Sequence, residues 1–336
     1  MKKYIFLITF SITVSICTAQ ILGPGTTAYT FLKLGVGVRP VAMGNAFTAI
    51  SDDGNAVFWN PAGLGLIQSY YVSGMAMNHL TYWNYYNLTS AIMLGKKAGG
   101  LGIGLAYISA YDTEYDEFGE MGNDFRNSDM LLNVGYGNAI GRKRQVAFGA
   151  SVKILRSQLY HYSSYGLLAD GGIVLNPVKY IYLGSVVKHF GAKTNYLEMW
   201  EYAPVNFRQG IAFKLPFRLN HFLVSMDYSL YPDVNPTLSV GAELHIREPK
   251  ILPTATKAVF GQDAKISGFS LMAGYQSGYQ SMGWSGLSFG FSLEIMMLEA
   301  LYLDIGGVFL SYGYLGNSER IGIGLNYAPT AKGSKK

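Results

Sequence analysis

The sequence predicts an all-β protein: a 14-stranded antiparallel transmembrane β-barrel with an N-terminal plug segment. Charged residues make up only 14% of the chain and aromatic residues another 14%, with 41 glycines, whereas a soluble domain usually carries about 25% charge. No stretch beyond the N-terminus is apolar for the roughly 20 residues that a membrane helix requires. Because only helices and closed barrels satisfy their backbone hydrogen bonds in lipid, this combination favours a barrel.

The first 19 residues have the order of a secretory signal peptide. Lys2 and Lys3 precede an apolar run from Tyr4 to Ile16, and small residues follow it. We therefore expect residues 1–19 to be removed on export. Lipidation at Cys17 is the alternative, which the bulky residue before it disfavours. Cleavage would also remove the one cysteine of the chain, so no disulfide or cysteine site is expected in the mature protein.

Strict alternation of side-chain character predicts the strands, because successive strand residues face opposite sides of a sheet. In "PTLSVGAELHIR", Pro236 to Arg247, every second residue from Leu238 to Ile246 is apolar, and the residues between them are small or polar. A transmembrane barrel turns such an apolar face to lipid and the other face to its lumen. Low charge disfavours the alternative of a soluble β-sandwich or propeller.

Fourteen such segments are expected between residues 68 and 328, an even number that suits a single-chain bacterial barrel. They begin near Gln68, Asn87, Gly100, Ser128, Gln145, Tyr165, Tyr180, Asn206, Asn220, Pro236, Lys265, Trp284, Ala300 and Ser318. Long outer loops are expected at 112–127 and 191–204, and one long inner connection at 248–264. Residues 329–336 form a basic tail.

Aromatic residues near the strand ends are expected in the interfacial girdle that barrels carry. They include Tyr70, Tyr71, Tyr82, Trp83, Tyr85 and Tyr86.

Charged residues on the polar faces are expected to line the lumen. They are Lys153, Asp170, Lys188, Arg208, Lys214, Asp227, Glu243, Arg247 and Asp304. Both signs are present, so we favour an interior joined by ion pairs, since a barrel of this width needs filling. A polar track for a solute is the alternative.

No group of residues indicates an enzyme, a metal site or a cofactor. Ser288 lies in a Gly-x-Ser-x-Gly pattern, but that motif needs a strand-to-helix elbow, and here it sits inside an alternating strand. The five histidines are far apart in sequence. The excess of 26 basic over 21 acidic residues is small and gives no support for nucleic-acid binding. The acidic loop 112–127 could bind a cation or a basic partner, although solvation alone is the simpler interpretation.

Residues 20–67 are too long for a linker and are expected to fold as the plug. Short helical potential at Ala42 to Ile50 is followed by turn-forming residues, since asparagine bonds locally and proline fixes its own φ. The expected plug motif comprises Asp52, Asp53, Asn55, Trp59, Asn60, Pro61, Ala62 and Gly63. We expect Trp59 to be buried and the aspartates to bond the backbone or a lumen Arg or Lys.

This box resembles the N-terminal signature of the PorV/PorQ family of outer-membrane proteins, which is itself similar to the FadL-like transporters. The resemblance runs from "FLKLG" at Phe31 through "AMG" at Ala42 to "WNPAGL" at Trp59. It implies a 14-stranded barrel in the bacterial outer membrane with a luminal plug. The Asn-Pro-Ala turn is common to both branches and does not choose between them.

The resemblance implies two functions and no catalysis. PorV-type proteins are accessory and carrier subunits of type IX secretion, which implies a translocon or exported proteins as partners beside outer-membrane lipid. FadL-like proteins carry hydrophobic small molecules such as fatty acids passively and release them through a kinked strand. We take the secretion role as the main expectation and hydrophobic transport as the alternative; a contiguous apolar pocket in the lumen would favour transport.

Overall fold

The structure, a computed structural model, describes residues 23, 25–79, 82–95, 97–141, 143–191, 194–196, 199–218, 220–247, 265–279 and 284–328. The predicted signal peptide 1–19 with Cys17, the connection 248–264 and the tail 329–336 lie outside the described residues.

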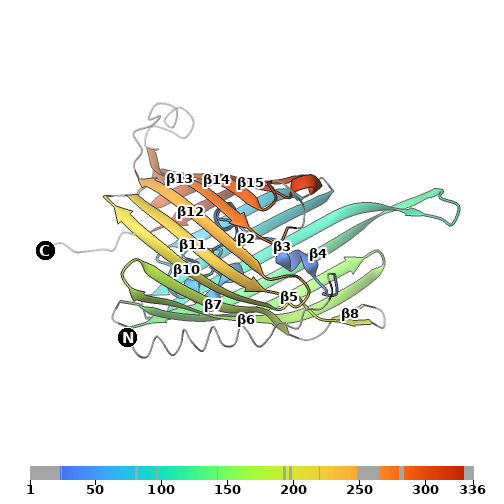
Figure 1. The fold of residues 1–336 in the computed structure, drawn as a ribbon, viewed down its shortest axis with the longest axis horizontal. Coiled ribbons are helices and arrows are strands. Elements are labelled where there is room, and N and C mark those ends of the chain that lie inside the picture. Colours follow the sequence, from blue (N-terminus) through green and yellow to red (C-terminus); the bar gives the residue numbers. More distant parts are fainter. Residues whose placement is uncertain are drawn as a thin grey trace.

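Fourteen strands of the described residues close into one antiparallel barrel, as predicted (Figure 1). Each barrel strand pairs with its neighbours in sequence order, with β7 next to β10, and β1 pairs with β16 to close the ring. The strands are β1 (Tyr70–His79), β2 (Trp83–Gly95), β3 (Gly99–Tyr115), β4 (Met121–Ile140), β5 (Val146–Leu159), β6 (Tyr162–Val178), β7 (Ile181–Gly191), β10 (Asn206–Phe217), β11 (Asn220–Leu230), β12 (Thr237–Arg247), β13 (Lys265–Gln276), β14 (Leu287–Leu298), β15 (Leu301–Ser311) and β16 (Asn317–Tyr327). No helix in the described part of the chain has the length and apolar character needed to cross a membrane.

Alternation in the sequence becomes two faces of the barrel wall. In β5 the side chains of Phe148, Val152 and Ile154 are exposed on the outside, while Ser151 and Lys153 between them are buried inside. The same alternation corrects the expectation of an interfacial girdle at three positions. Tyr85 of β2 is only 1% exposed and faces the lumen, and Tyr71 and Trp83 pack against the buried core.

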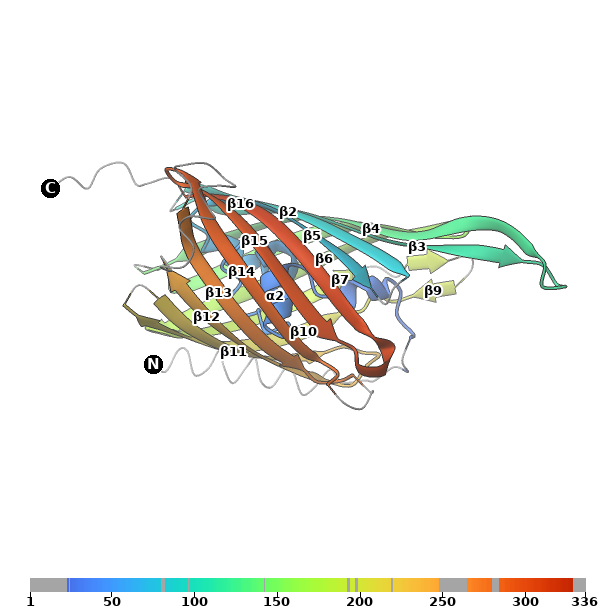
Figure 2. The ribbon, with the colours of Figure 1, turned by 90° about the horizontal axis from the view of Figure 1, so that it is seen from above.

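The two ends of the barrel differ. At the turn end, short connections such as those between β2 and β3 and between β6 and β7 join the strands, and the described chain ends there after β16. At the loop end, the β3–β4 hairpin projects beyond the rest of the barrel (Figures 1 and 2). A short η3 helix (Gly313–Leu315) also lies at this end.

The expectation of long loops at 112–127 and 191–204 was wrong in detail. Residues Ala110 to Tyr115 pair with Met121 to Asn127, so the first loop is mostly hairpin. Within the second, β8 (Thr194–Tyr196) and β9 (Met199–Glu201) form a separate two-stranded sheet. Backbone pairing does not require an apolar face. Most side chains of the projecting β3–β4 hairpin are exposed to solvent, so its sequence lacks the alternation that marks the barrel strands.

Residues Gly25 to Ile67, named here the luminal segment, lie inside the barrel (Figure 2). Their short helices are η1 (Thr30–Lys33), α2 (Val38–Ala42), α3 (Ala56–Trp59) and η2 (Pro61–Gly65). Helix α2 contacts β13 to β16, whereas η2 contacts β3 to β6 on the other side. The segment starts at the loop end, where the Ala28 N–H donates to the Tyr202 carbonyl over 2.9 Å, and it leads into β1 at the turn end.

The helix predicted at Ala42 to Ile50 does not form. Helix α2 lies earlier in the chain and ends at Ala42. Gly44 and Asn45 follow with φ of 60° and 66°, a left-handed conformation that stops a right-handed helix. Gly44 also lies against the barrel wall, where a Cβ atom would stand 2.5 Å from the Tyr275 nitrogen. The close approach of segment and wall therefore requires glycine here.

Candidate functional site

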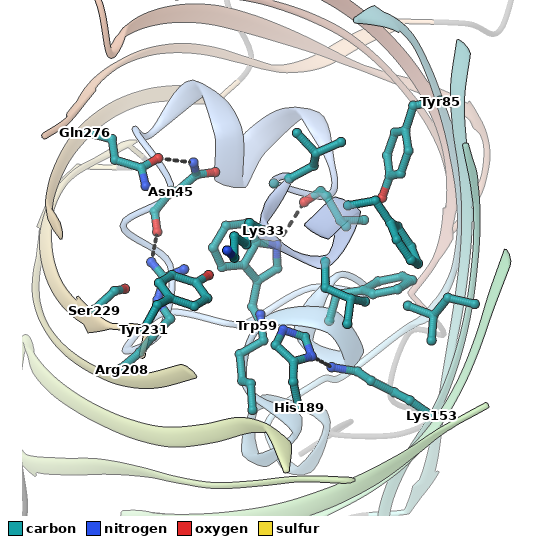
Figure 3. A pocket seen from close by; sticks show the side chains of 18 residues that line it. Lys33, Asn45, Trp59, Tyr85, Lys153, His189, Arg208, Ser229, Tyr231 and Gln276 are labelled. Atoms are coloured by element: carbon teal, nitrogen blue, oxygen red, sulfur yellow. Dashed lines mark hydrogen bonds between the residues drawn. The ribbon is translucent and has the colours of Figure 1, made fainter. Parts of the chain in front are cut away.

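The centre of the lumen holds a small cavity, here called the central cavity, of about 30 Å³. The η1 helix and the residues after it line one side, and the barrel wall lines the other. Figure 3 shows Trp59 in the middle of this site, with His189 and Arg208 beside it. Lys188 also lines the cavity, and its ammonium lies over the Trp59 ring. A water needs about 10–15 Å³ of such space, so the cavity as it stands holds about two or three waters and no organic ligand.

Trp59 is anchored on every side. Its indole N–H donates to the Val36 carbonyl over 2.8 Å, and its ring makes a T-shaped contact with Phe47, with the ring centroids 6.2 Å apart. The Lys188 ammonium lies 5.3 Å from the ring centroid and the Arg208 guanidinium 5.0 Å. Both distances are within the range of a cation–π interaction.

A β-bulge shapes the wall beside Trp59. The β6–β7 register shifts between Ala169 and Gly171, so that Asp170 of β6 stands opposite both Lys188 and His189 of β7. His189 has a left-handed φ of 61°. The Asp170 carboxylate accepts the His189 N–H over 2.8 Å and forms a buried ion pair with Lys153.

Arg208 and Asp227 join the wall to the luminal segment. Their ion pair spans 3.1 Å, and Arg208 also donates to the Asn45 carbonyl. The Asp227 carboxylate accepts the N–H groups of Phe47 and Thr48 at 3.1 and 2.9 Å and the Thr48 hydroxyl at 2.6 Å. All of these donors meet one carboxylate oxygen, Oδ2, which therefore anchors the luminal segment to β11.

Lys188 differs from these cations because it forms no ion pair or hydrogen bond with the described residues. Its side chain is buried, with the whole residue 7% exposed, and its ammonium lies over the face of Trp59. A buried ammonium without a carboxylate is costly, so this position favours an anionic group in the cavity.

The plug-motif residues lie on both sides of Trp59. Asn60 donates to the Thr48 carbonyl at 3.0 Å and to the Ile173 carbonyl of β6 at 3.2 Å, and its own carbonyl accepts the Ala62 N–H. Pro61, Ala62 and Gly63 form the buried η2 turn against the wall. Asn55 N–H donates to the Asp53 side chain at 2.8 Å.

The two aspartates of the motif meet an arginine that the sequence did not single out for this role. Arg39 of α2 lies 2.6 Å from Asp52, 3.3 Å from Asp53 and 2.9 Å from Glu243, and Lys214 lies 3.3 Å from Asp52. Burial alone would raise the pKa of the Asp52 carboxyl, but Arg39 and Lys214 outweigh it and hold that pKa well below its usual range. Burial raises the pKa of Asp53, an effect that Arg39 offsets only in part.

Replacing both aspartates, Asp52→Ala with Asp53→Ala, is expected to loosen the luminal segment. The Asp52 side chain is 33% exposed, so solvent screens its pairs, and we expect a loss of about 1 kcal/mol in the free energy of unfolding. Leakage of small solutes from vesicles holding the protein should rise measurably. Asp112→Ala, at an exposed site on the projecting hairpin, serves as the control. Unchanged leakage and stability in the double variant would count against the role of these residues.

The remaining predicted residues are dispersed. Asp304 lines a separate cavity at the turn end, and Arg247 is exposed at the end of β12. Ser288 accepts the Gly44 N–H and donates to the Ala42 carbonyl, so it fastens α2 to the wall. Among the described residues no group of three or more His, Cys, Asp or Glu is placed to hold a metal ion.

Two buried contacts were missed from the sequence. Arg320 of β16 is 1% exposed and donates to the Gly35 carbonyl. Its position two residues before Gly322, on the small-residue face of β16, could have predicted an inward side chain. The second contact is the ion pair of Lys33 with Asp233, which joins the luminal segment to the β11–β12 loop. The sequence around these two residues has no pattern that predicts their pairing.

The fold of this chain has solved counterparts. The Pseudomonas putida toluene transporter TodX is 11% identical, with a TM-score of 0.54 over 92% of this chain and 98% of that chain. A Pseudomonas aeruginosa FadL homologue is 10% identical, with a TM-score of 0.50 over 88% and 99%. The CymD monoaromatic hydrocarbon channel is 12% identical, with a TM-score of 0.51 over 89% and 99%. No protein-family model and no curated protein sequence matches the chain.

These likenesses show the fold, a closed 14-stranded barrel like those of FadL-type proteins. The structures are of a toluene transporter, a FadL homologue and a monoaromatic hydrocarbon channel, and none of the three is of a PorV or PorQ protein. The resemblance to FadL-like barrels is therefore supported at the level of the fold. The resemblance to the PorV/PorQ family in particular stays a hypothesis.

Proposed function

We propose that this chain is a barrel of the bacterial outer membrane that passes hydrophobic small molecules passively, with residues 20–67 as its plug. The observation that carries the proposal is the luminal segment, which crosses from one wall to the other around a central cavity in a barrel of the TodX type. Apolar side chains such as Val72, Leu88 and Ile154 are exposed on the outer face and suit contact with lipid.

The substrate we favour is a fatty acid or a similar molecule with an apolar body and an anionic head. Phe31, Leu32 and Leu131 give the cavity apolar walls, and the Lys188 ammonium is without a carboxylate partner among the described residues. Because the cavity is too small for such a molecule, the residues from Phe31 to Val36 must move when it binds.

Reconstitution into lipid vesicles tests this proposal. We expect wild-type protein to speed the entry of a medium-chain fatty acid at least several-fold over empty vesicles. Lys188→Met should reduce entry of the fatty acid while leaving entry of toluene unchanged, because only the charged head needs the ammonium. Lys97→Met, at an exposed turn, is the matched control. If each solute entered protein-containing vesicles no faster than empty vesicles, transport would be refuted.

A secretion-linked role is the second candidate, and the projecting β3–β4 hairpin favours it. Tyr111, Phe118 and Met121 are 65%, 83% and 72% exposed on the hairpin, where a protein partner could cover them. Crosslinking from Phe118 in intact cells tests this role. It predicts capture of a translocon subunit or an exported protein, whereas recovery of the uncrosslinked barrel alone would reject it.

A further inference from the structure

A second cavity, here called the turn-end chamber, lies between the luminal segment and the wall formed by β10 to β16, β1 and β2. It has a volume of about 280 Å³, several times that of the central cavity. The chamber lies on the side of α2 that faces Glu243, whereas the central cavity lies around Trp59.

The side chains that line the chamber carry an excess of negative charge. Its carboxylates are Asp52, Asp53, Glu243, Glu294 and Asp304, and its permanent cations are Arg39 and Lys214. Arg39 and Lys214 are both engaged with the first three carboxylates. Glu294 and Asp304 form no ion pair with any described residue.

Glu294 of β14 and Asp304 of β15 are direct cross-strand partners, and both line the chamber. Like charges directly opposite each other on neighbouring strands destabilise a sheet. Glu294 accepts one hydrogen bond, from the Ser267 hydroxyl at 2.6 Å, and the Asp304 side chain accepts none from the described residues. A cation between the two carboxylates would remove this repulsion.

The amide side chains of the chamber point independently to a missing donor. Asn55 and Asn87 line it and are only 4% and 6% exposed, yet the side-chain oxygen of each has no hydrogen-bond partner among the described residues. The side-chain oxygen of Asn326, from β16, is also without one. Buried acceptors of this kind are normally satisfied, and three amide oxygens here are not, beside one unpartnered ring nitrogen, Nε2 of His221.

We propose that the turn-end chamber binds an alkylammonium group, with Glu294 and Asp304 as its counter-charges. An ammonium has three donors and no acceptor, which matches a site of carboxylates and unpartnered amide oxygens. Val38, Tyr71 and Ile305 also line the chamber and can pack against a short alkyl chain. A metal ion fits less well, because no described set of three ligating side chains converges there.

The ammonium has two possible sources. One is a free amine that enters from solution at the turn end. The other is the chain itself, because Lys332, Lys335 and Lys336 follow in sequence within ten residues of Asn326. The chemistry recognised is the same, and the experiment separates the two sources.

Isothermal titration of the full-length protein in detergent with n-butylammonium chloride tests the proposal, with n-butanol as the neutral control. We expect the ammonium to bind and butanol not to bind. Glu294→Gln with Asp304→Asn should weaken binding at least tenfold, whereas Glu319→Gln, an exposed glutamate of β16, should leave it unchanged. Circular dichroism checks that each variant retains the barrel, and Asp304→Asn alone replaces the double variant if that one does not fold.

Replacing Lys332, Lys335 and Lys336 by Gln identifies the source. Binding of butylammonium at least tenfold tighter than in wild type would assign the site to the chain's own lysines. Unchanged binding would assign it to a free amine. Absence of binding in both wild type and this variant would overturn the proposal, as would equal affinity in the carboxylate variant and wild type.

Discussion

Trp59→Ala is expected to lower the free energy of unfolding by about 3–5 kcal/mol, the usual cost of truncating a buried tryptophan. The indole is 3% exposed, and its removal breaks the hydrogen bond to Val36. It also leaves the Lys188 ammonium without the ring that it lies over. Equilibrium unfolding in urea, followed by far-UV circular dichroism in lipid vesicles, measures the loss.

The same substitution should increase permeation, because the vacated space adjoins the central cavity. We expect faster entry of a fatty acid into vesicles, together with the loss of stability. Trp200→Ala is the matched control, since that indole is 63% exposed on β9 and packs at no comparable site. Equal changes in the two variants, or no gain of permeation in Trp59→Ala, would contradict the placement of Trp59 at the closure of the lumen.

The barrel could be predicted from the sequence because each strand residue has only two environments. A one-residue rule of alternation then assigns Lys153, Arg208 and Asp227 to the interior without any knowledge of their neighbours. The structure buries all three, each less than 5% exposed. The count of 14 strands follows from the same rule repeated along the chain.

The pairing of these residues could not be predicted, because it depends on the path of the luminal segment through the lumen. Arg39 reaches three carboxylates only because α2 lies against β13 to β16. That position is fixed by contacts such as Gly44 against Tyr275, which leave no periodic pattern in the sequence. For the same reason the bulge at Asp170, which brings Lys188 and His189 to Trp59, has no sequence signature.

The projecting β3–β4 hairpin shows that alternation also misses some strands. Asp112 and Asp124 lie on paired strands, but both faces of the hairpin meet solvent, so burial imposes no alternation there. Hydrophobic periodicity reports burial on one face rather than backbone pairing itself. A strand exposed on both faces is therefore taken for a loop when sequence alone is used.

Asp227→Ala is expected to destabilise the protein by about 3–5 kcal/mol, because it leaves the Arg208 guanidinium buried without its counter-charge. It also removes the acceptor for the N–H groups of Phe47 and Thr48, which hold the middle of the luminal segment to β11. Unfolding in urea measures the loss. Asp124→Ala, at an exposed position with one described side-chain hydrogen bond, is the control and should cost less than about 1 kcal/mol.

The double variant Asp227→Ala with Arg208→Met separates the two contributions. Removing both charges eliminates the uncompensated guanidinium, so this variant should recover part of the stability lost in Asp227→Ala. What it does not recover is the cost of the two unpaired N–H groups and of the Arg208 bond to the Asn45 carbonyl. If the double variant were less stable than Asp227→Ala by the full effect of Arg208→Met alone, the two side chains would act independently. The buried pair would then not be what fastens the luminal segment to the wall.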